Sequence, residues 1–87
     1  MMAGRFRSAD GQSAVSPSVA VLKAEKALDM ASRLQRSGDL AGAIQSCREG
    51  IAWVADAEDT AALRLRVRLR AQCEVVTRLR REALRAA

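Results

Sequence analysis

The segment 63–70 alternates strictly between apolar residues and arginines, and this alternation constrains the fold more than any other feature of the chain. A period of two over eight residues is typical of a half-buried β-strand. Three observations oppose a strand here. No Gly, Pro, Asn or Asp follows the run, its alanine-rich flanks favour a helix, and the chain offers no second strand to pair with it. We therefore predict a helix over about 60–85.

The helical interpretation gives this segment one continuous apolar stripe, because residues three and four apart share a face of a helix. The predicted core face consists of Ala62, Leu65, Leu69, Cys73 or Gln72, Val76, Leu79 and Ala83. A second, mixed face then lies opposite the core. It supplies the candidate partner-binding residues Leu63, Arg66, Val67, Arg70, Thr77 and Arg81. This face is either the edge of a groove that receives an amphipathic peptide or a solvated surface with two exposed aliphatic residues.

Two more helices are predicted upstream. Ser16-Pro17 resembles a helix start, since Ser caps the first turn and Pro suits the first helical position. The first helix should span about 17–36, with its apolar stripe at Ala20, Ala24, Ala27, Leu28, Ala31 and Leu34. Gly38 should end it in the left-handed conformation, and Asp39 should cap the next helix. So short a turn makes the two helices antiparallel.

The second helix should span about 40–55, with a stripe at Leu40, Ala43, Ile44, Cys47, Ile51 and Val54. Gly50 falls on the same face. Glycine inside a helix costs about 1 kcal/mol relative to alanine, so its presence there predicts a close helix crossing. Trp53 lies off the stripe, either as a residue at the edge of the core or as an exposed anchor for a partner. Asp59 or Thr60 should cap the third helix after the acidic connector 56–60.

These elements predict an all-α fold, an antiparallel three-helix bundle over residues 16–87 preceded by a flexible N-terminal segment, 1–15. The charge is divided unevenly. Residues 61–87 carry eight arginines and two glutamates, which is +6, whereas residues 1–60 carry seven basic and eight acidic groups, which is −1. The last helix is therefore the expected working surface, and its charge favours an acidic partner.

Several classes of function are disfavoured. The chain has no histidine, no glycine-rich phosphate loop and no set of metal ligands, so we expect no enzyme, no cofactor and no metal site. Cys47 and Cys73 are expected to be small core residues rather than a disulfide. No apolar run approaches the roughly 20 residues of a membrane span. We expect a monomeric, cytoplasmic protein with no transmembrane segment.

The segment from Ala31 to Val54, with Gly38-Asp39-Leu40, Ala43-Ile44, Cys47, Ile51 and Trp53-Val54, resembles the first hairpin of a MIT (microtubule-interacting and trafficking) domain. Leu65-Arg66-Val67-Arg68 and Leu69-Arg70-Ala71-Gln72 both resemble the Ile/Leu-Arg run of that family's third helix. The resemblance covers about residues 17–84. It implies an adaptor that binds helical peptide tails of the ESCRT-III type beside the third helix, with a role in vesicle trafficking or at microtubules.

The chain departs from the family at two points. Cys47 stands where the family usually has Tyr, and arginines stand where its third helix tends to present acids to basic tails. These arginines favour a more acidic partner. Two alternatives remain: a polyanion-binding module for the acidic tubulin surface, acidic lipid or nucleic acid, and a tetratricopeptide-like module for interaction or oligomerisation. Nucleic acid is the least expected ligand, because no aromatic residues interleave with the arginines. A tetratricopeptide array is disfavoured because the pattern does not repeat.

Overall fold

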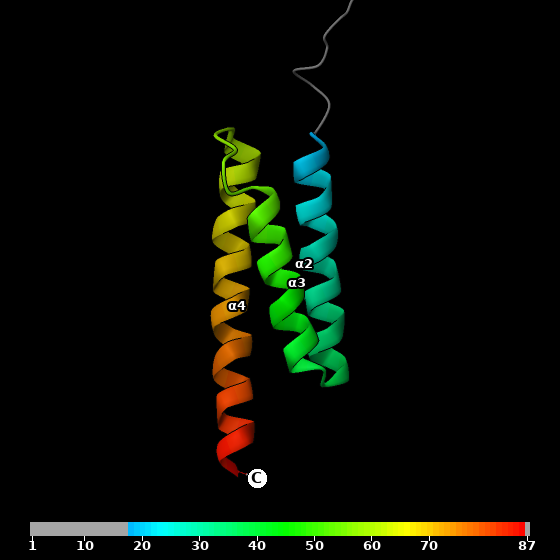
Figure 1. Ribbon diagram of the computed structural model, residues 1–87, viewed down its shortest axis with the longest axis vertical. Helices are drawn as coiled ribbons and strands as arrows, with labels where there is room; N and C mark the ends of the chain where they lie inside the picture. The colour runs from blue at the N-terminus through cyan, green and yellow to red at the C-terminus, as the bar shows by residue number, and fades with distance from the viewer. Residues whose placement is uncertain (1–17, 87) are drawn as a thin grey trace, which may run out of the picture.

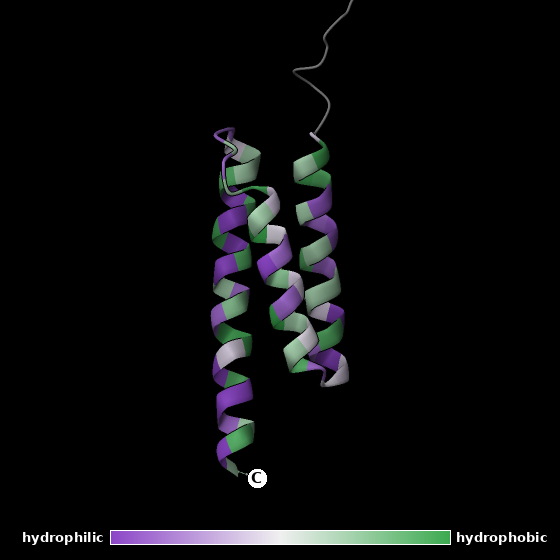
Figure 2. Cartoon of the chain, in the orientation of Figure 1, coloured by the Kyte–Doolittle hydropathy of each residue, from purple (hydrophilic) through white to green (hydrophobic). Residues whose placement is uncertain are grey.

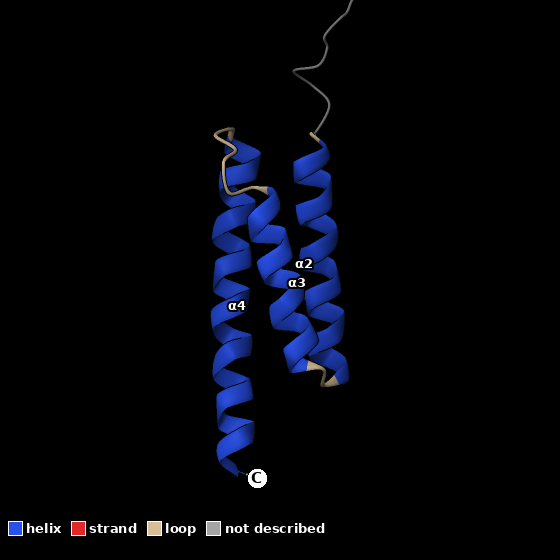
Figure 3. Cartoon of the chain, viewed as in Figure 1, coloured by secondary structure: helices blue, strands red, loops and turns tan. Residues whose placement is uncertain are grey.

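The computed structural model describes residues 18–86, and these form three α-helices joined by two short loops (Figure 3). Helix α2 spans Val19–Ser37, α3 spans Leu40–Trp53 and α4 spans Thr60–Ala86. Figure 1 shows α3 running antiparallel to both of its neighbours, so that α2 and α4 point in the same direction. The predicted antiparallel three-helix bundle is confirmed. The predicted flexible segment 1–15 lies outside the described residues.

The start of α2 differs from the prediction. The side chain of Ser18, rather than Ser16, caps the helix, because its Oγ accepts a hydrogen bond from the backbone N–H of Val21 at 3.1 Å. Ser16 and Pro17 lie outside the described residues. Two serines flank this proline, and either can supply the capping oxygen. The helix therefore begins at Val19, two residues later than predicted.

The turn between α2 and α3 is as predicted. Gly38 adopts the left-handed conformation with φ of 91°, and its N–H donates to the carbonyl of Gln35. The carboxylate of Asp39 then accepts from the backbone N–H of Gly42 at 2.9 Å, which caps α3. At the other end of the molecule, Asp59 accepts from the N–H of Ala62 at 3.3 Å, so Asp59 rather than Thr60 provides the side-chain cap of α4.

The core forms two clusters along the bundle, both made mainly of small aliphatic residues. One lies toward the connector and contains Val21, Ala24, Val54, Ala62, Leu65 and Leu69. The other lies toward the α2–α3 turn and contains Ala31, Ala43, Ile44, Cys47 and Val76. Val21 is buried although it was not assigned to the predicted stripe. The other members belong to the predicted stripes, so the three-and-four spacing identified most of the core.

Gly50 lies at the closest crossing of the helices. A Cβ atom at this position would come within 2.9 Å of the Ala27 Cβ and within 3.0 Å of both methyl groups of Leu69. A separation of 2.9 Å is shorter than real Cβ contacts and 3.0 Å is shorter than nearly all of them, so the missing side chain at Gly50 allows α2, α3 and α4 to approach this closely. The predicted close crossing is confirmed.

The stripe of α4 ends earlier than predicted. Val76 is fully buried, whereas Leu79 is 38% exposed and Ala83 is exposed. Figure 1 shows the reason: α4 runs past the α2–α3 turn, so its last turns have no neighbouring helix. The prediction that Leu79 and Ala83 belong to the core was wrong, because α4, with 27 residues, extends beyond its 14-residue neighbour α3.

Candidate functional site on the arginine-rich helix

The six residues predicted to form one surface are divided by the structure into three groups. Arg66 turns back toward the end of α3. Its guanidinium donates to the carbonyl oxygen of Ala55 at 2.6 Å and to that of Val54 at 3.4 Å. These carbonyls follow the last turn of α3 and have no helical partner, so Arg66 caps α3 from another helix. Helix α3 ends at Trp53, two residues before its predicted end at about residue 55.

Leu63 and Val67 form the second group. They are 40% and 68% exposed, as expected for residues opposite the core. Together with Thr60, Arg64 and Arg68 they line a shallow hollow of about 430 Å³ on the outer side of α4. All five residues come from the first three turns of one helix. The hollow therefore has no wall from a second element.

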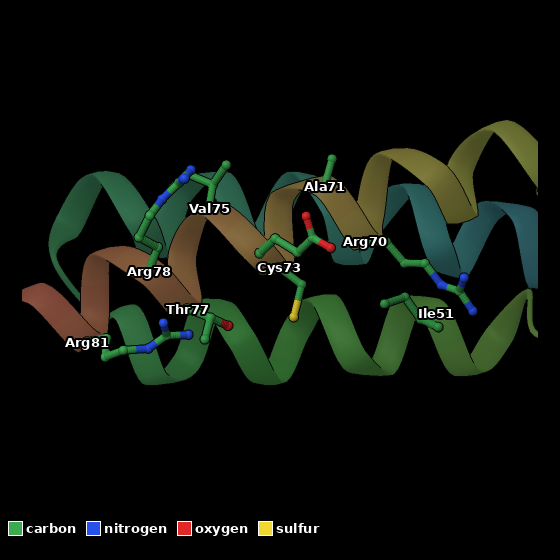
Figure 4. Close-up of a pocket in the computed structure, with 9 residues that line it drawn as sticks. Ile51, Arg70, Ala71, Cys73, Val75, Thr77, Arg78 and Arg81 are labelled. Atoms are coloured by element: carbon green, nitrogen blue, oxygen red, sulfur yellow. The ribbon is translucent and has the colours of Figure 1, made fainter.

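The third group lines a larger groove of about 610 Å³ on α4, beside α3. Arg70, Cys73, Thr77 and Arg81 follow one another at spacings of three and four residues, which places them on one face of α4. Figure 4 shows Cys73 and Thr77 directed toward α3. From α3, Ile51 contributes an apolar side chain to the groove. The remaining lining residues are Ala71, Glu74, Val75 and Arg78.

The groove carries an excess of positive charge. Arg70, Arg78 and Arg81 line it, and Glu74 is the one acidic residue among its lining residues. Within residues 18–86, the ion pair that the structure shows joins Arg33 to Asp29 at 3.0 Å, both on α2. None of the eight α4 arginines forms an ion pair within the described chain. Figure 2 shows how hydrophilic and hydrophobic residues alternate along this helix. Apart from that of Arg66, which is bonded to the end of α3, its guanidinium groups are available to an external acidic group.

The two cysteines are free thiols. Burial, and to a smaller extent repulsion from the nearby Cys73 thiolate, raise the pKa of Cys47 to about 11. A thiol with so high a pKa is protonated at neutral pH and is a poor nucleophile. Among residues 18–86 no cluster of three or more His, Cys, Asp or Glu side chains is arranged to hold a metal ion.

Trp53 lies at the end of α3, on an edge shared with α2. Its side chain is 48% exposed, and the Nζ atom of Lys23 lies 5.8 Å from the centre of its ring. This distance permits a cation–π contact. Half-burial against a lysine of α2 agrees with the interpretation of Trp53 as an edge residue.

Sequence reasoning placed Arg70, Thr77 and Arg81 together correctly, but it missed the role of Arg66 and the contribution of Ile51. The helical period assigns each residue to a face of its own helix, and it carries no information about which neighbour that face meets. Ile51 was assigned to the core stripe, whereas the structure leaves it only partly buried, at the margin of the groove. The Arg66 contact crosses the connector, over eleven residues.

Comparison with protein-family models, with curated proteins and with solved structures gives no match to this chain. No helix within the described residues is both long enough and apolar enough to cross a membrane.

Proposed function

We propose that this chain is a non-catalytic adaptor that binds an acidic helical peptide in the groove beside α4. The observation that carries the proposal is the combination in this groove of an apolar side chain, Ile51, with three arginines that have no acidic partner within the described chain. Apolar contacts supply affinity in such interfaces, and the charges direct orientation and specificity.

The length of the groove suits a helix. Arg70 and Arg81 are eleven residues apart on α4, which corresponds to about 16 Å at 1.5 Å per residue. A ligand helix of about three turns spans that distance. It would place its apolar face against Ile51 and Cys73 and its carboxylates toward the arginines at either end. This is the helix-in-groove mode, in which anchors recur at three and four residues along the ligand.

The resemblance to MIT domains supports a peptide tail as the ligand and a cytoplasmic setting such as vesicle trafficking or a microtubule-linked process. The arginines of α4 favour a tail more acidic than the usual ESCRT-III type. No aromatic side chain lines the groove. Stacking on bases is therefore not available there, which favours peptide over single-stranded nucleic acid.

Titration of the ¹⁵N-labelled chain with a synthetic acidic amphipathic helix tests this proposal. We expect backbone amide signals of Ile51, Arg70, Cys73 and Thr77 to shift, and the Arg70→Glu/Arg81→Glu double variant to bind at least tenfold more weakly. Arg64→Glu/Arg68→Glu is the matched control, because it makes the same charge change outside the groove. Equal weakening by both double variants, or shifts that avoid the groove, would contradict the proposal.

A second candidate, a polyanion-binding module, is favoured by the same absence of ion pairs along the whole of α4. Its contacts would be spread over all eight arginines, and its affinity would fall steeply with salt. Acidic lipid vesicles, microtubules and an oligonucleotide should then bind about as well as an acidic peptide. Indifference to the apolar face of the peptide would select this alternative.

A further inference from the structure

The last turns of α4 form a second exposed surface, of which Arg78 and Arg81 alone also line the groove. Residues 78–86, the overhang, follow the last buried side chain of the helix, Val76, and every one of them is exposed. Figure 1 shows the overhang extending beyond the turn that joins α2 to α3. The helix is nevertheless continuous through Ala86.

The overhang has an apolar side. Leu79 and Ala83 lie three and seven residues after Val76, so they continue the core stripe and point to the side on which the α2–α3 hairpin lies. Leu84 lies next to them around the helix and is 65% exposed. In the body of the bundle this side of α4 is covered by α2 and α3. Along the overhang, no described residue covers it.

A basic side chain lies within this apolar side. At 100° per residue, Arg80 falls between Ala83 and Leu84. The overhang as a whole contains four arginines, Arg78, Arg80, Arg81 and Arg85, and one acid, Glu82, which is +3. An occupant of this surface must therefore offer acidic groups beside its apolar residues, since an unpaired arginine in an apolar contact is costly.

We propose that the overhang, through Leu79, Arg80, Ala83 and Leu84, is a docking surface for an acidic amphipathic helix of a partner protein. Seated there, the helix continues the bundle beyond the hairpin, with apolar residues on Leu79 and Leu84 and a carboxylate on Arg80. This site is distinct from the groove, whose lining includes Arg70, Cys73 and Thr77 but not Leu79, Arg80 or Leu84.

Two other occupants fit less well. A flat lipid surface cannot reach the apolar side closely, because the α2–α3 hairpin projects from the same side of α4. A second copy of this chain would bring two overhangs of +3 together, with Arg80 in both contact faces, and like charges oppose that contact. A separate acidic helix meets neither obstacle.

The test uses a fluorescein-labelled 18-residue peptide with leucines on one helical face and glutamates elsewhere, and a counterpart with lysines in place of the glutamates. Fluorescence anisotropy gives affinity, and ¹⁵N spectra give location. We expect the acidic peptide to shift the signals of Leu79, Ala83 and Leu84. Leu79→Gln/Leu84→Gln should weaken binding at this site, followed by the Ala83 signal, at least fivefold, and Arg80→Glu should transfer the preference of this site to the lysine peptide.

The chain offers a closely matched control, Leu63→Gln/Val67→Gln. These residues are 40% and 68% exposed, against 38% and 65% for Leu79 and Leu84, so the two double variants remove similar apolar surface at opposite ends of α4. The control should bind the acidic peptide like the unmodified chain. Equal weakening by both pairs would overturn the proposal.

Three further outcomes would overturn it and identify the alternative. Shifts confined to Ile51, Arg70 and Thr77 mean that only the groove binds, which leaves the proposed function intact. The variant Leu79→Gln/Leu84→Gln could abolish binding to phosphatidylserine vesicles and leave peptide binding unchanged. That result would identify a lipid surface as the occupant. A dimer in sedimentation equilibrium that the same variant dissociates indicates a second copy. Shifts confined to Leu79, Arg80, Ala83 and Leu84 would instead support this site and reject the groove.

Discussion

The guanidinium of Arg66 donates a hydrogen bond to the carbonyl oxygen of Ala55 at 2.6 Å, and thereby ties the second turn of α4 to the end of α3. The two residues are separated by the connector, so this contact holds the chain reversal between the helices. Arg66 thus has a structural role, although it alternates with apolar residues in the same way as its neighbours. Arg64 and Arg68, two residues away on either side, face outward.

Replacement of Arg66 by alanine should destabilise the fold by about 1 kcal/mol, because the hydrogen bonds from its charged guanidinium to the carbonyls of Ala55 and Val54 are lost. Urea unfolding followed by circular dichroism measures this change. Arg64→Ala is the control, since the structure shows no hydrogen bond or ion pair for Arg64 within residues 18–86. Equal stability of the two variants would show that the Arg66 contact contributes nothing.

Replacement of Gly50 by alanine should also destabilise the protein, although alanine is the better helix former. The new methyl group would meet the Ala27 Cβ at 2.9 Å and the Leu69 methyls at 3.0 Å. Overpacking of this kind costs about 1–3 kcal/mol, which exceeds or offsets the gain of about 1 kcal/mol in helix propensity. Thermal unfolding would show a lower midpoint. A midpoint raised by several degrees would mean that the crossing has room for a side chain.

The two leucines on the predicted stripe of α4 should respond very differently to truncation. Leu69 is fully buried, so Leu69→Ala should cost about 2–5 kcal/mol through lost burial and a cavity. Leu79 is 38% exposed on the overhang, and Leu79→Ala should cost less than about 1 kcal/mol. Denaturant titrations of the two variants provide the comparison. Similar losses would place Leu79 in the core after all.

The stability of the chain should fall as the solution becomes alkaline. The pKa of Cys47 is raised to about 11 in the folded state, while an exposed thiol titrates near 8.5–9. Between these values the unfolded chain releases a proton that the folded chain retains, so the free energy of unfolding decreases with rising pH. The stability that the protonated Cys47 thiol contributes is fully present below about pH 8.5. About 2 kcal/mol of it is lost by pH 10.5.

Urea titrations at pH 8 and pH 10.5 measure this dependence. The informative quantity is the difference in pH dependence between the unmodified chain and Cys47→Ala, because this difference isolates the contribution of Cys47. The variant should retain the part of the pH dependence that other groups cause and lose the part due to Cys47. An unchanged pH dependence in the variant would rule out Cys47 as its source.

Much of the fold could be predicted because it depends on local chemistry. Gly38 and Asp39 define the first turn, since a left-handed residue ends one helix and a capping carboxylate begins the next. The alternating segment forms a helix, as its alanine-rich flanks and the absence of a pairing strand indicated. The first helix was placed two residues early, because two serines near Pro17 carry the same capping signal.

The candidate site was only partly predictable. The helical period correctly placed Arg70, Thr77 and Arg81 on one line. It grouped Leu63 and Val67 with them because, at 100° per residue, Leu63 and Arg81 lie on one line of the helix and Val67 lies about 40° away. The position of α3 separates the two sets: it lies against the face of Thr77 and Cys73, and Leu63 and Val67 remain on the outer side.

The sequence alone determined three helices, their order, the glycine crossing at Gly50 and the concentration of positive charge on the last helix. The tertiary structure decided what each part of that helix does. Arg66 forms hydrogen bonds with the end of α3, and Arg70 and Arg81 line a groove. Leu79 and Leu84 remain uncovered beyond the α2–α3 hairpin. The physical reason is that helical periodicity is a property of one segment, whereas burial depends on where its neighbours begin and end.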